Sequence, residues 1–294
     1  MACFHPLDAF QTEAGSIVFS ERGSIRRGLT LPCGQCVGCR LDRSRRWAMR
    51  CVHEASMYDV NSFVTLTYED GNCPTSLNYG DFQLFMKRLR KKMGKVRFFM
   101  CGEYGEKLGR PHYHACLFGV HFDDRYLWSE SSGQVRLYRS PLLESLWPHG
   151  FSTVGDVTFD SAAYVAAYCM KKVNGDRADA HYEKVSLSSG EIVKVRPEFA
   201  RMSLKPGIGQ PWFQKFSADV YGYDRDAVVL NGVKSKPPRY YDLLLKATDP
   251  DLAEYLEYDR YVRAGKVVSD CTPERLKVRE AVTKARLSLK QRSI

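Results

Sequence analysis

Two histidines stand one residue apart in the segment GRPHYHACLF (109–118), directly after an Arg-Pro pair. The run from residue 111 to 120 predicts a β-strand, and side chains at positions i and i+2 of a strand point to the same face. His112 and His114 would therefore lie side by side. Imidazole is the commonest metal ligand in proteins, so the pair would form half of a metal site. A pair of solvated polar side chains on a sheet surface is the alternative.

A carboxylate that would complete such a site lies on the preceding predicted strand. Segments 95–104 and 111–120 predict two strands joined by a short glycine-bounded connection, which is typical of a hairpin. In an antiparallel hairpin, Glu103 would lie close to the two histidines. Two imidazoles and a carboxylate suit Mg²⁺ or Mn²⁺, with positions left open for substrate oxygens. A structural zinc site with Cys116 as fourth ligand is the alternative.

Two tyrosines recur at helical spacing further along, in the segment DSAAYVAAYCMKKV (160–173). Tyr164 and Tyr168 are four residues apart and would share one helix face, with Lys171 and Lys172 close by. A phenol is a poor nucleophile at neutral pH, but a metal-bound phosphodiester and a nearby ammonium would favour its attack on phosphorus. Two aromatic side chains that only cover the edge of a core are the alternative.

Three cysteines stand at intervals of three residues in LPCGQCVGCR, at positions 33, 36 and 39. Thiolates at this spacing can wrap one metal ion, and structural Zn²⁺ with four N or S ligands is the favoured occupant. Cys3 would complete an all-cysteine site; the candidates for the fourth ligand are Cys3, His5, Cys51 and His53. An iron–sulfur cluster and three free thiols are the alternatives.

The overall charge favours a polyanionic partner. The 294 residues include 44 Lys and Arg against 34 Asp and Glu, which gives a net charge of +10. The sequence has no P-loop motif, which excludes a nucleotide-driven motor of that kind. It also has no secretory signal and no apolar run long enough for a membrane span, so we expect a cytosolic protein in which disulfides are rare.

Basic side chains concentrate on two predicted helices, spanning 41–58 and 78–94. A run of charge is usually a solvated face, but in a basic protein beside a cysteine knuckle we expect phosphate contacts. The residues predicted to bind DNA are Arg43, Arg45, Arg46, Arg50, Lys87, Arg88, Arg90, Lys91 and Arg110.

The order strand, helix, hairpin, strand, helix predicts an α+β fold, an antiparallel sheet with helices on one side. The last helix would begin with Asp160 or Ser161 as its N-cap. Segment 121–150 is expected to be irregular. The predicted divisions are a Cys-rich knuckle with a basic helix (1–60), the sheet core (61–175), a loop-rich extension (176–238) and a charged helical tail (239–294).

Three motifs in this order resemble those of the HUH-endonuclease replication initiators: FVTLTY, HYH after Arg-Pro, and YVAAYCMKK. The tyrosine pair resembles the two-tyrosine rolling-circle initiators, and the Cys cluster with its basic helix resembles the gokushovirus-like microviruses. Motif similarity covers about residues 62–173. The resemblance implies an HUH/RRM-like core in which His112, His114 and Glu103 bind the metal. Tyr164 and Tyr168 would be the nucleophiles, assisted by Lys171 or Lys172.

The function implied by this resemblance is nicking of single-stranded phage DNA at the origin. A 5′-phosphotyrosine intermediate and a free 3′-hydroxyl would form, and the DNA would later be rejoined. Host helicase and polymerase would be partners in the bacterial cytoplasm. Tyr168, three residues before Lys171, is expected to be the more sensitive tyrosine. A non-enzymatic zinc-knuckle nucleic-acid-binding protein and a metal-dependent phosphodiesterase that uses water are the alternatives.

Overall fold

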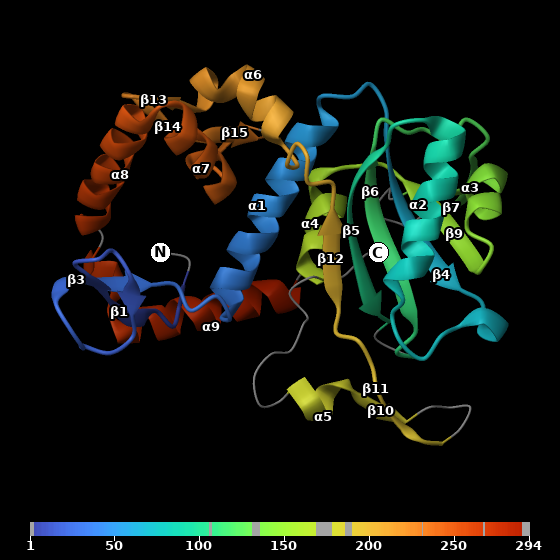
Figure 1. Cartoon of the computed structure of the whole chain (residues 1–294), viewed down its shortest axis with the longest axis horizontal. Helices are drawn as coiled ribbons and strands as arrows, with labels where there is room; N and C mark the ends of the chain where they lie inside the picture. The colour runs from blue at the N-terminus through green and yellow to red at the C-terminus, as the bar shows by residue number, and fades with distance from the viewer. Residues whose placement is uncertain are drawn as a thin grey trace. The chain divides into compact units, whose positions relative to one another are not determined.

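The structure is a computed structural model that describes residues 3–105, 108–130, 136–168, 178–185, 190–230, 232–266 and 268–289 (Figure 1). Its contacts group the chain into two compact units. We call Ser44–Thr248 the core unit, and Met1–Arg43 together with Asp249–Arg292 the terminal unit. The boundary falls inside helix α1 (Val37–Ala55). The division into four segments stays a prediction.

The core unit is built on a seven-stranded antiparallel sheet with strand order β12-β5-β6-β4-β9-β8-β7. Its strands are β4 (Asn61–Tyr68), β5 (Arg97–Tyr104), β6 (Pro111–Phe118), β7 (Tyr126–Glu130), β8 (Arg136–Arg139), β9 (Gly150–Gly155) and β12 (Phe199–Met202). The central strands are rich in the β-branched and aromatic residues that suit a pleated, buried surface. The predicted α+β class and the predicted β5–β6 hairpin are both confirmed.

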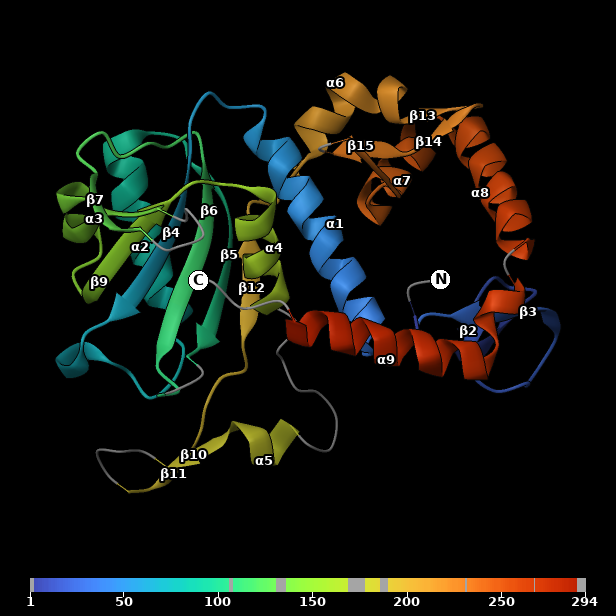
Figure 2. The same ribbon diagram turned by 180° about the vertical axis from the view of Figure 1, so that it is seen from behind.

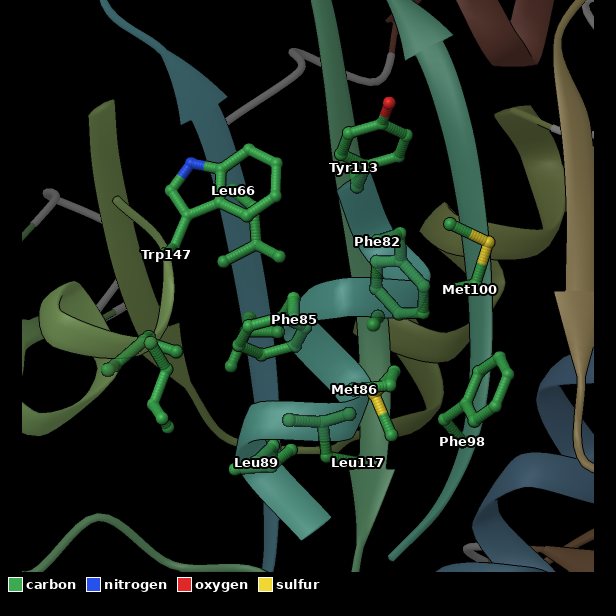
Figure 3. Packing of buried hydrophobic residues seen from close by; sticks show 14 of the residues in the cluster. Leu66, Phe82, Phe85, Met86, Leu89, Phe98, Met100, Tyr113, Leu117 and Trp147 are labelled. Carbon is green, nitrogen blue, oxygen red and sulfur yellow. The ribbon is translucent and has the colours of Figure 1, made fainter. Parts of the chain in front are cut away.

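Helix α2 (Tyr79–Met93) covers one face of the sheet (Figure 1). Its apolar residues recur at helical spacing and are buried: Phe82, Phe85, Met86 and Leu89. They pack against strand residues such as Leu66, Tyr113 and Leu117 and against Trp147 (Figure 3). Burial of each such side chain contributes about 1.5–3 kcal/mol, so this cluster is the main core.

Helices α1 and α4 (Phe159–Tyr168) cover the opposite face (Figure 2). Ala162 and Ala166 are fully buried there, which lets α4 lie close to the strands as the alanine pattern predicted. The Ser44 hydroxyl ties the two helices together by donating to the Ala163 carbonyl at 2.8 Å. The prediction of helices on one side only was wrong. All eight residues of β5 are buried, and a strand that is apolar on both faces needs cover on both.

The N-terminus of α4 is capped by Thr158, so the prediction of Asp160 or Ser161 was wrong. The Thr158 hydroxyl accepts from the Ser161 backbone N–H at 3.1 Å, and the Ser161 hydroxyl accepts from the Thr158 N–H at 2.8 Å. This reciprocal arrangement is a capping box in which serine replaces the usual glutamate. It fixes the point at which the tyrosine-bearing helix leaves β9.

Two segments contain more regular structure than predicted. The segment 121–150, expected to be irregular, contributes β7 and β8 to the sheet and includes α3 (Pro141–Leu146). The segment 176–238, expected to be rich in loops, supplies β12. Its other elements are α5 (Ala178–Tyr182), β10 (Glu183–Val185), β11 (Ile192–Lys194), α6 (Gln210–Val220), β13 (Tyr221–Gly222), β14 (Arg225–Asp226), β15 (Val228–Leu230) and β16 (Val233–Ser235). Helix α7 (Arg239–Thr248) ends the core unit.

The terminal unit joins the two ends of the chain. Its sheet has the order β2-β1-β3, formed by β1 (Leu7–Thr12), β2 (Ile17–Val18) and β3 (Ile25–Leu31). Its helices are α8 (Pro250–Gly265) and α9 (Pro273–Leu289), so the predicted C-terminal helical extension is confirmed. Leu276 of α9 is buried against Cys3, Phe4 and Cys36. Across the described ranges, no helix combines the length and the apolar character that a membrane span requires.

Candidate active site

The β5–β6 hairpin brings Glu103, His112 and His114 together on one face of the sheet. Glu103 and His112 are direct cross-strand partners. One oxygen of Glu103, Oε1, lies 2.8 Å from His112 Nε2 and 3.0 Å from His114 Nε2. Their ligand atoms all lie within 4.8 Å of one another. The grouping expected from the sequence is therefore present in the structure.

The other nitrogen of each imidazole is held by a neighbouring oxygen. His112 Nδ1 lies 3.1 Å from the Arg110 carbonyl, which can only accept, so Nδ1 carries the proton. His114 Nδ1 lies 2.9 Å from the Thr65 hydroxyl on β4. Such contacts orient metal-binding imidazoles and direct the Nε2 lone pair to the metal. Both Nε2 atoms converge on the Glu103 carboxylate.

The Glu103 carboxyl group is buried but stays ionised. Burial acts to raise its pKa, but the hydrogen bonds from His112 and His114 outweigh that effect and bring the pKa below its ordinary value. An anionic oxygen and two imidazole nitrogens form a donor set that a divalent cation can use. These residues therefore fit the Mg²⁺ or Mn²⁺ ion expected from the sequence.

Cys116 does not join this group. It is fully buried among apolar residues of the α1–α4 face, including Phe63 and Phe118. Among the described residues, the candidate ligands at this position are Glu103, His112 and His114 alone. The alternative of a four-ligand zinc site with Cys116 was therefore wrong.

Helix α4 places Tyr164 at the histidines. The Tyr164 ring meets the His114 ring edge-on, with ring centroids 5.1 Å apart. Tyr168 is the last residue of α4, one turn further along, and its side chain lies outside the described part of the structure. Lys171 and Lys172 also lie outside the described residues. Of the predicted nucleophiles and their helpers, Tyr164 is the one whose side chain is located beside the candidate metal ligands.

The four cysteines Cys3, Cys33, Cys36 and Cys39 also form one group, with sulfur atoms within 4.8 Å of one another. Backbone N–H groups point at these sulfurs: Phe4 donates to Cys36 at 3.3 Å and Cys33 donates to Cys3 at 3.2 Å. Cys3 is therefore the fourth member. The other candidates lie elsewhere: His5 pairs with Glu280, His53 stacks on Trp212, and Cys51 is buried with the α1–α4 cluster.

The environment of this cluster favours a thiolate at Cys36. Burial acts to raise the Cys36 pKa, but the N–H donors of Phe4 and Cys39 and the neighbouring Cys39 and Cys33 side chains lower it to about 6. The pKa of Cys39 is raised, first by burial and also by its neighbours Cys3 and Cys36. Closely spaced sulfurs with one acidic thiol fit a metal such as zinc, which binds cysteine as thiolate.

The basic residues predicted on α1 make contacts within the protein. Arg43 donates to the Gly34 carbonyl at 3.4 Å and Arg45 to the Lys236 carbonyl at 2.9 Å. Arg46 is half-buried. The Arg50 guanidinium lies 4.0 Å from the ring centroids of both Trp47 and Tyr240 and donates to the Ile208 carbonyl. The role of these residues in DNA binding stays a prediction.

The basic residues of α2 lie on the face of the sheet opposite to the histidines. Lys87, Arg90 and Lys91 are exposed, whereas Arg88 is half-buried and donates to the Leu146 carbonyl. Arg110 lies next to the site in sequence, and its guanidinium is paired with Asp70. DNA held at the histidines would have to pass around the edge of the sheet to meet α2.

Two neighbours of the site were not identified from the sequence. Thr65 holds His114, and the Phe63 ring lies parallel to the His114 ring with centroids 5.9 Å apart. Both are on β4, whose motif was interpreted as a structural strand. The signal was the alternation of β4, which puts Phe63, Thr65 and Thr67 on one face, but only the β4–β6 register shows that this is the histidine face.

Comparisons with known proteins identify the family. Residues 61–173 match the family model of the ORF2-type replication-associated proteins. The replication-associated protein VP4 of Bdellovibrio phage phiMH2K is 34% identical over 279 residues, covering 90% of this chain and 82% of that protein. The replication-associated protein ORF2 of Spiroplasma virus 4 is 30% identical over 290 residues, covering 88% of this chain and 84% of that protein.

A third relative, the replication-associated protein ORF4 of Chlamydia phage 1, is 32% identical over 255 residues, covering 82% of this chain and 60% of that protein. No solved structure gives a significant match. The similarity to the phage proteins extends well beyond the matched model and includes both units. The chain belongs to the replication-associated proteins of gokushovirus-like microviruses.

Proposed function

We propose that this protein is a replication initiator that nicks single-stranded phage DNA at its origin through a tyrosine nucleophile and later rejoins the strand. The observation that carries the proposal is the contact of the Tyr164 ring with His114, which belongs to the Glu103–His112–His114 group. This contact brings a phenol to a candidate metal site on a chain whose relatives are named as replication-associated proteins.

Glu103, His112 and His114 would hold the Mg²⁺ or Mn²⁺ ion. When bound, such an ion polarises a phosphodiester and stabilises the negative charge that develops during displacement. The carboxylate and the two oriented imidazoles supply a fixed set of donors. The reaction therefore depends on the register of the β5–β6 hairpin, which sets the distances among the three side chains.

In the cleavage step the Tyr164 phenol oxygen forms a bond to phosphorus while the bond from phosphorus to the 3′-oxygen breaks. The phenol proton passes to solvent, and the departing 3′-oxygen takes up a proton. Because the ordinary pKa of a phenol is about 10, an ammonium group nearby would favour loss of its proton. We assign this role to Lys171 or Lys172.

The second tyrosine would make the reaction a cycle. Tyr168 follows Tyr164 by one helical turn, so both can serve one site with a small shift of the DNA. While one tyrosine holds the 5′-phosphate, the other can attack the regenerated origin. The released 3′-hydroxyl then attacks the first phosphotyrosine, re-forms the phosphodiester and frees the phenol.

The test is a covalent DNA adduct that survives denaturant. We expect Tyr164→Phe and Tyr168→Phe each to retain part of single-round cleavage and the double variant to form no adduct. Tyr240→Phe is a matched control, because this residue packs on Arg50 away from the histidines. An undiminished adduct in the double variant, mapped by mass spectrometry to another residue, would refute the mechanism. Cleavage without any adduct would favour a phosphodiesterase that uses water.

The non-enzymatic alternative rests on the cysteine cluster, for which we propose a structural role with zinc as the bound metal. An iron–sulfur cluster would show as iron and acid-labile sulfide in the purified protein. DNA binding without cleavage at any metal concentration would support this alternative. We further propose the single-stranded origin as DNA partner, and host helicase and polymerase as protein partners in the bacterial cytoplasm.

A further inference from the structure

A row of four side chains crosses the sheet at the candidate site and ends in an exposed phenylalanine. Glu103 on β5 lies opposite His112 on β6, His112 lies opposite Thr67 on β4, and Thr67 lies opposite Phe151 on β9. Residues directly opposite one another on neighbouring strands share a face. Phe151 therefore stands on the same face as the candidate metal ligands.

Phe151 is 58% exposed although its strand lies inside the sheet, between β4 and β8. The helix on this face, α4, contacts β5 and β6 and packs with a buried cluster that does not include Phe151. Neighbouring strands are about 4.8 Å apart, so the backbones at His112 and Phe151 are about 10 Å apart. An open aromatic ring thus lies within one or two nucleotides of the metal ligands.

The backbone holds this ring in place. Gly150, which precedes it, has φ +153°, and a Cβ there would collide with the backbone of Tyr68 and Glu69. The start of β9 is therefore packed closely on the end of β4. A single exposed apolar side chain is common on protein surfaces, but this one continues the row that contains the site.

We propose that Phe151 stacks on a base of the single-stranded DNA and so positions the scissile phosphate at Glu103, His112 and His114. The occupant is a single strand because a ring that stands up from a sheet meets the face of an unstacked base, whereas duplex bases are already stacked. A chain with net charge +10 attracts the phosphates without selecting bases, so stacking would supply a contact that phosphates cannot. This proposal deepens the proposed function and rests on it.

The test separates base stacking from phosphate contact. Two labelled oligomers of equal length, one of thymidine and one of abasic sites, carry the same charge; only the first has bases to stack. Binding is measured in EDTA with the Tyr164→Phe, Tyr168→Phe double variant as background, so no cleavage takes place. We expect Phe151→Ala to weaken thymidine-oligomer binding about tenfold and to leave abasic-oligomer binding unchanged.

Phe151→Trp should restore thymidine binding, whereas Phe151→Leu should not, since leucine is apolar but cannot stack. Leu84→Ala is the matched control, because Leu84 is 46% exposed on α2, on the other face of the sheet. Equal affinity of wild type and Phe151→Ala for the thymidine oligomer would overturn the proposal. An equal loss for both oligomers would also overturn it. Neither outcome depends on cleavage, so a failed adduct assay would reject the proposed function separately.

Discussion

Stability should fall steeply as the pH drops below 7, because of His53. This residue is 4% exposed between α1 and the segment that carries α6 and α7. Its ring stacks on Trp212 with centroids 3.5 Å apart, and its Nδ1 lies 2.8 Å from the Tyr241 hydroxyl. Burial disfavours the charged imidazolium and lowers the His53 pKa to about 4.

The sign follows from proton binding. At pH values between the folded pKa of about 4 and the unfolded value of about 6.5, the unfolded chain binds a proton at His53 that the folded chain does not. Acid therefore favours unfolding. One pKa unit corresponds to about 1.4 kcal/mol, so lowering the pH from 7 to 5 should reduce the free energy of unfolding by about 2 kcal/mol through this residue.

The measurement is urea denaturation of wild type and His53→Gln at pH 7 and pH 5. Glutamine does not titrate and can still hydrogen-bond to Tyr241, so the variant should lose this part of the pH dependence. Other titrating groups, including the cysteine cluster, affect both proteins alike and cancel in the difference. If the two proteins lose the same free energy between pH 7 and pH 5, the buried neutral state of His53 is refuted.

Three further predictions concern the site and the cluster. His112→Ala or His114→Ala, like EDTA, should abolish nicking in a gel assay while DNA binding stays largely intact, because phosphate contacts supply most of the positioning; full activity of the double variant in EDTA would contradict the metal assignment. Elemental analysis should find one tightly held zinc, and Cys36→Ser should release it and destabilise the fold by about 2 kcal/mol or more. Gly150→Ala should cost about 1–3 kcal/mol in denaturation, since its Cβ meets backbone, whereas Gly71→Ala, with open space around it, should not.

Local patterns predicted the hairpin site well. The spacing of His112 and His114 and the short β5–β6 connection are enough to place Glu103 opposite His112, because a hairpin limits the possible registers. The apolar spacing of α2 was equally informative, since its buried residues repeat with the helical period. Cys3 was only one of four candidates for the cluster, because its distance from Cys33 along the chain hides their proximity in space.

What the sequence did not predict depends on contacts between distant segments. The short strand β12 pairs with β5 across about a hundred residues, and its four residues carry too little pattern to be recognised. Helices on both faces were missed because alternation in β5 is hidden when both faces are buried. Thr158 was missed as a cap because threonine, aspartate and serine all occur within four residues at that point, and each is a good N-cap.

Strand β6 builds the core and the site from alternate residues, so packing on one face sets the geometry of the other. Tyr113 stands between the two histidines and is fully buried on the α2 side. Its hydroxyl donates to the Asn78 carbonyl at 2.7 Å and accepts from the Asn78 N–H at 3.0 Å. A slip of β6 by one residue would break these bonds and turn both histidines into the core. The tyrosine at this position, where the resemblance led us to expect an apolar residue, therefore holds the metal ligands in register through the start of α2.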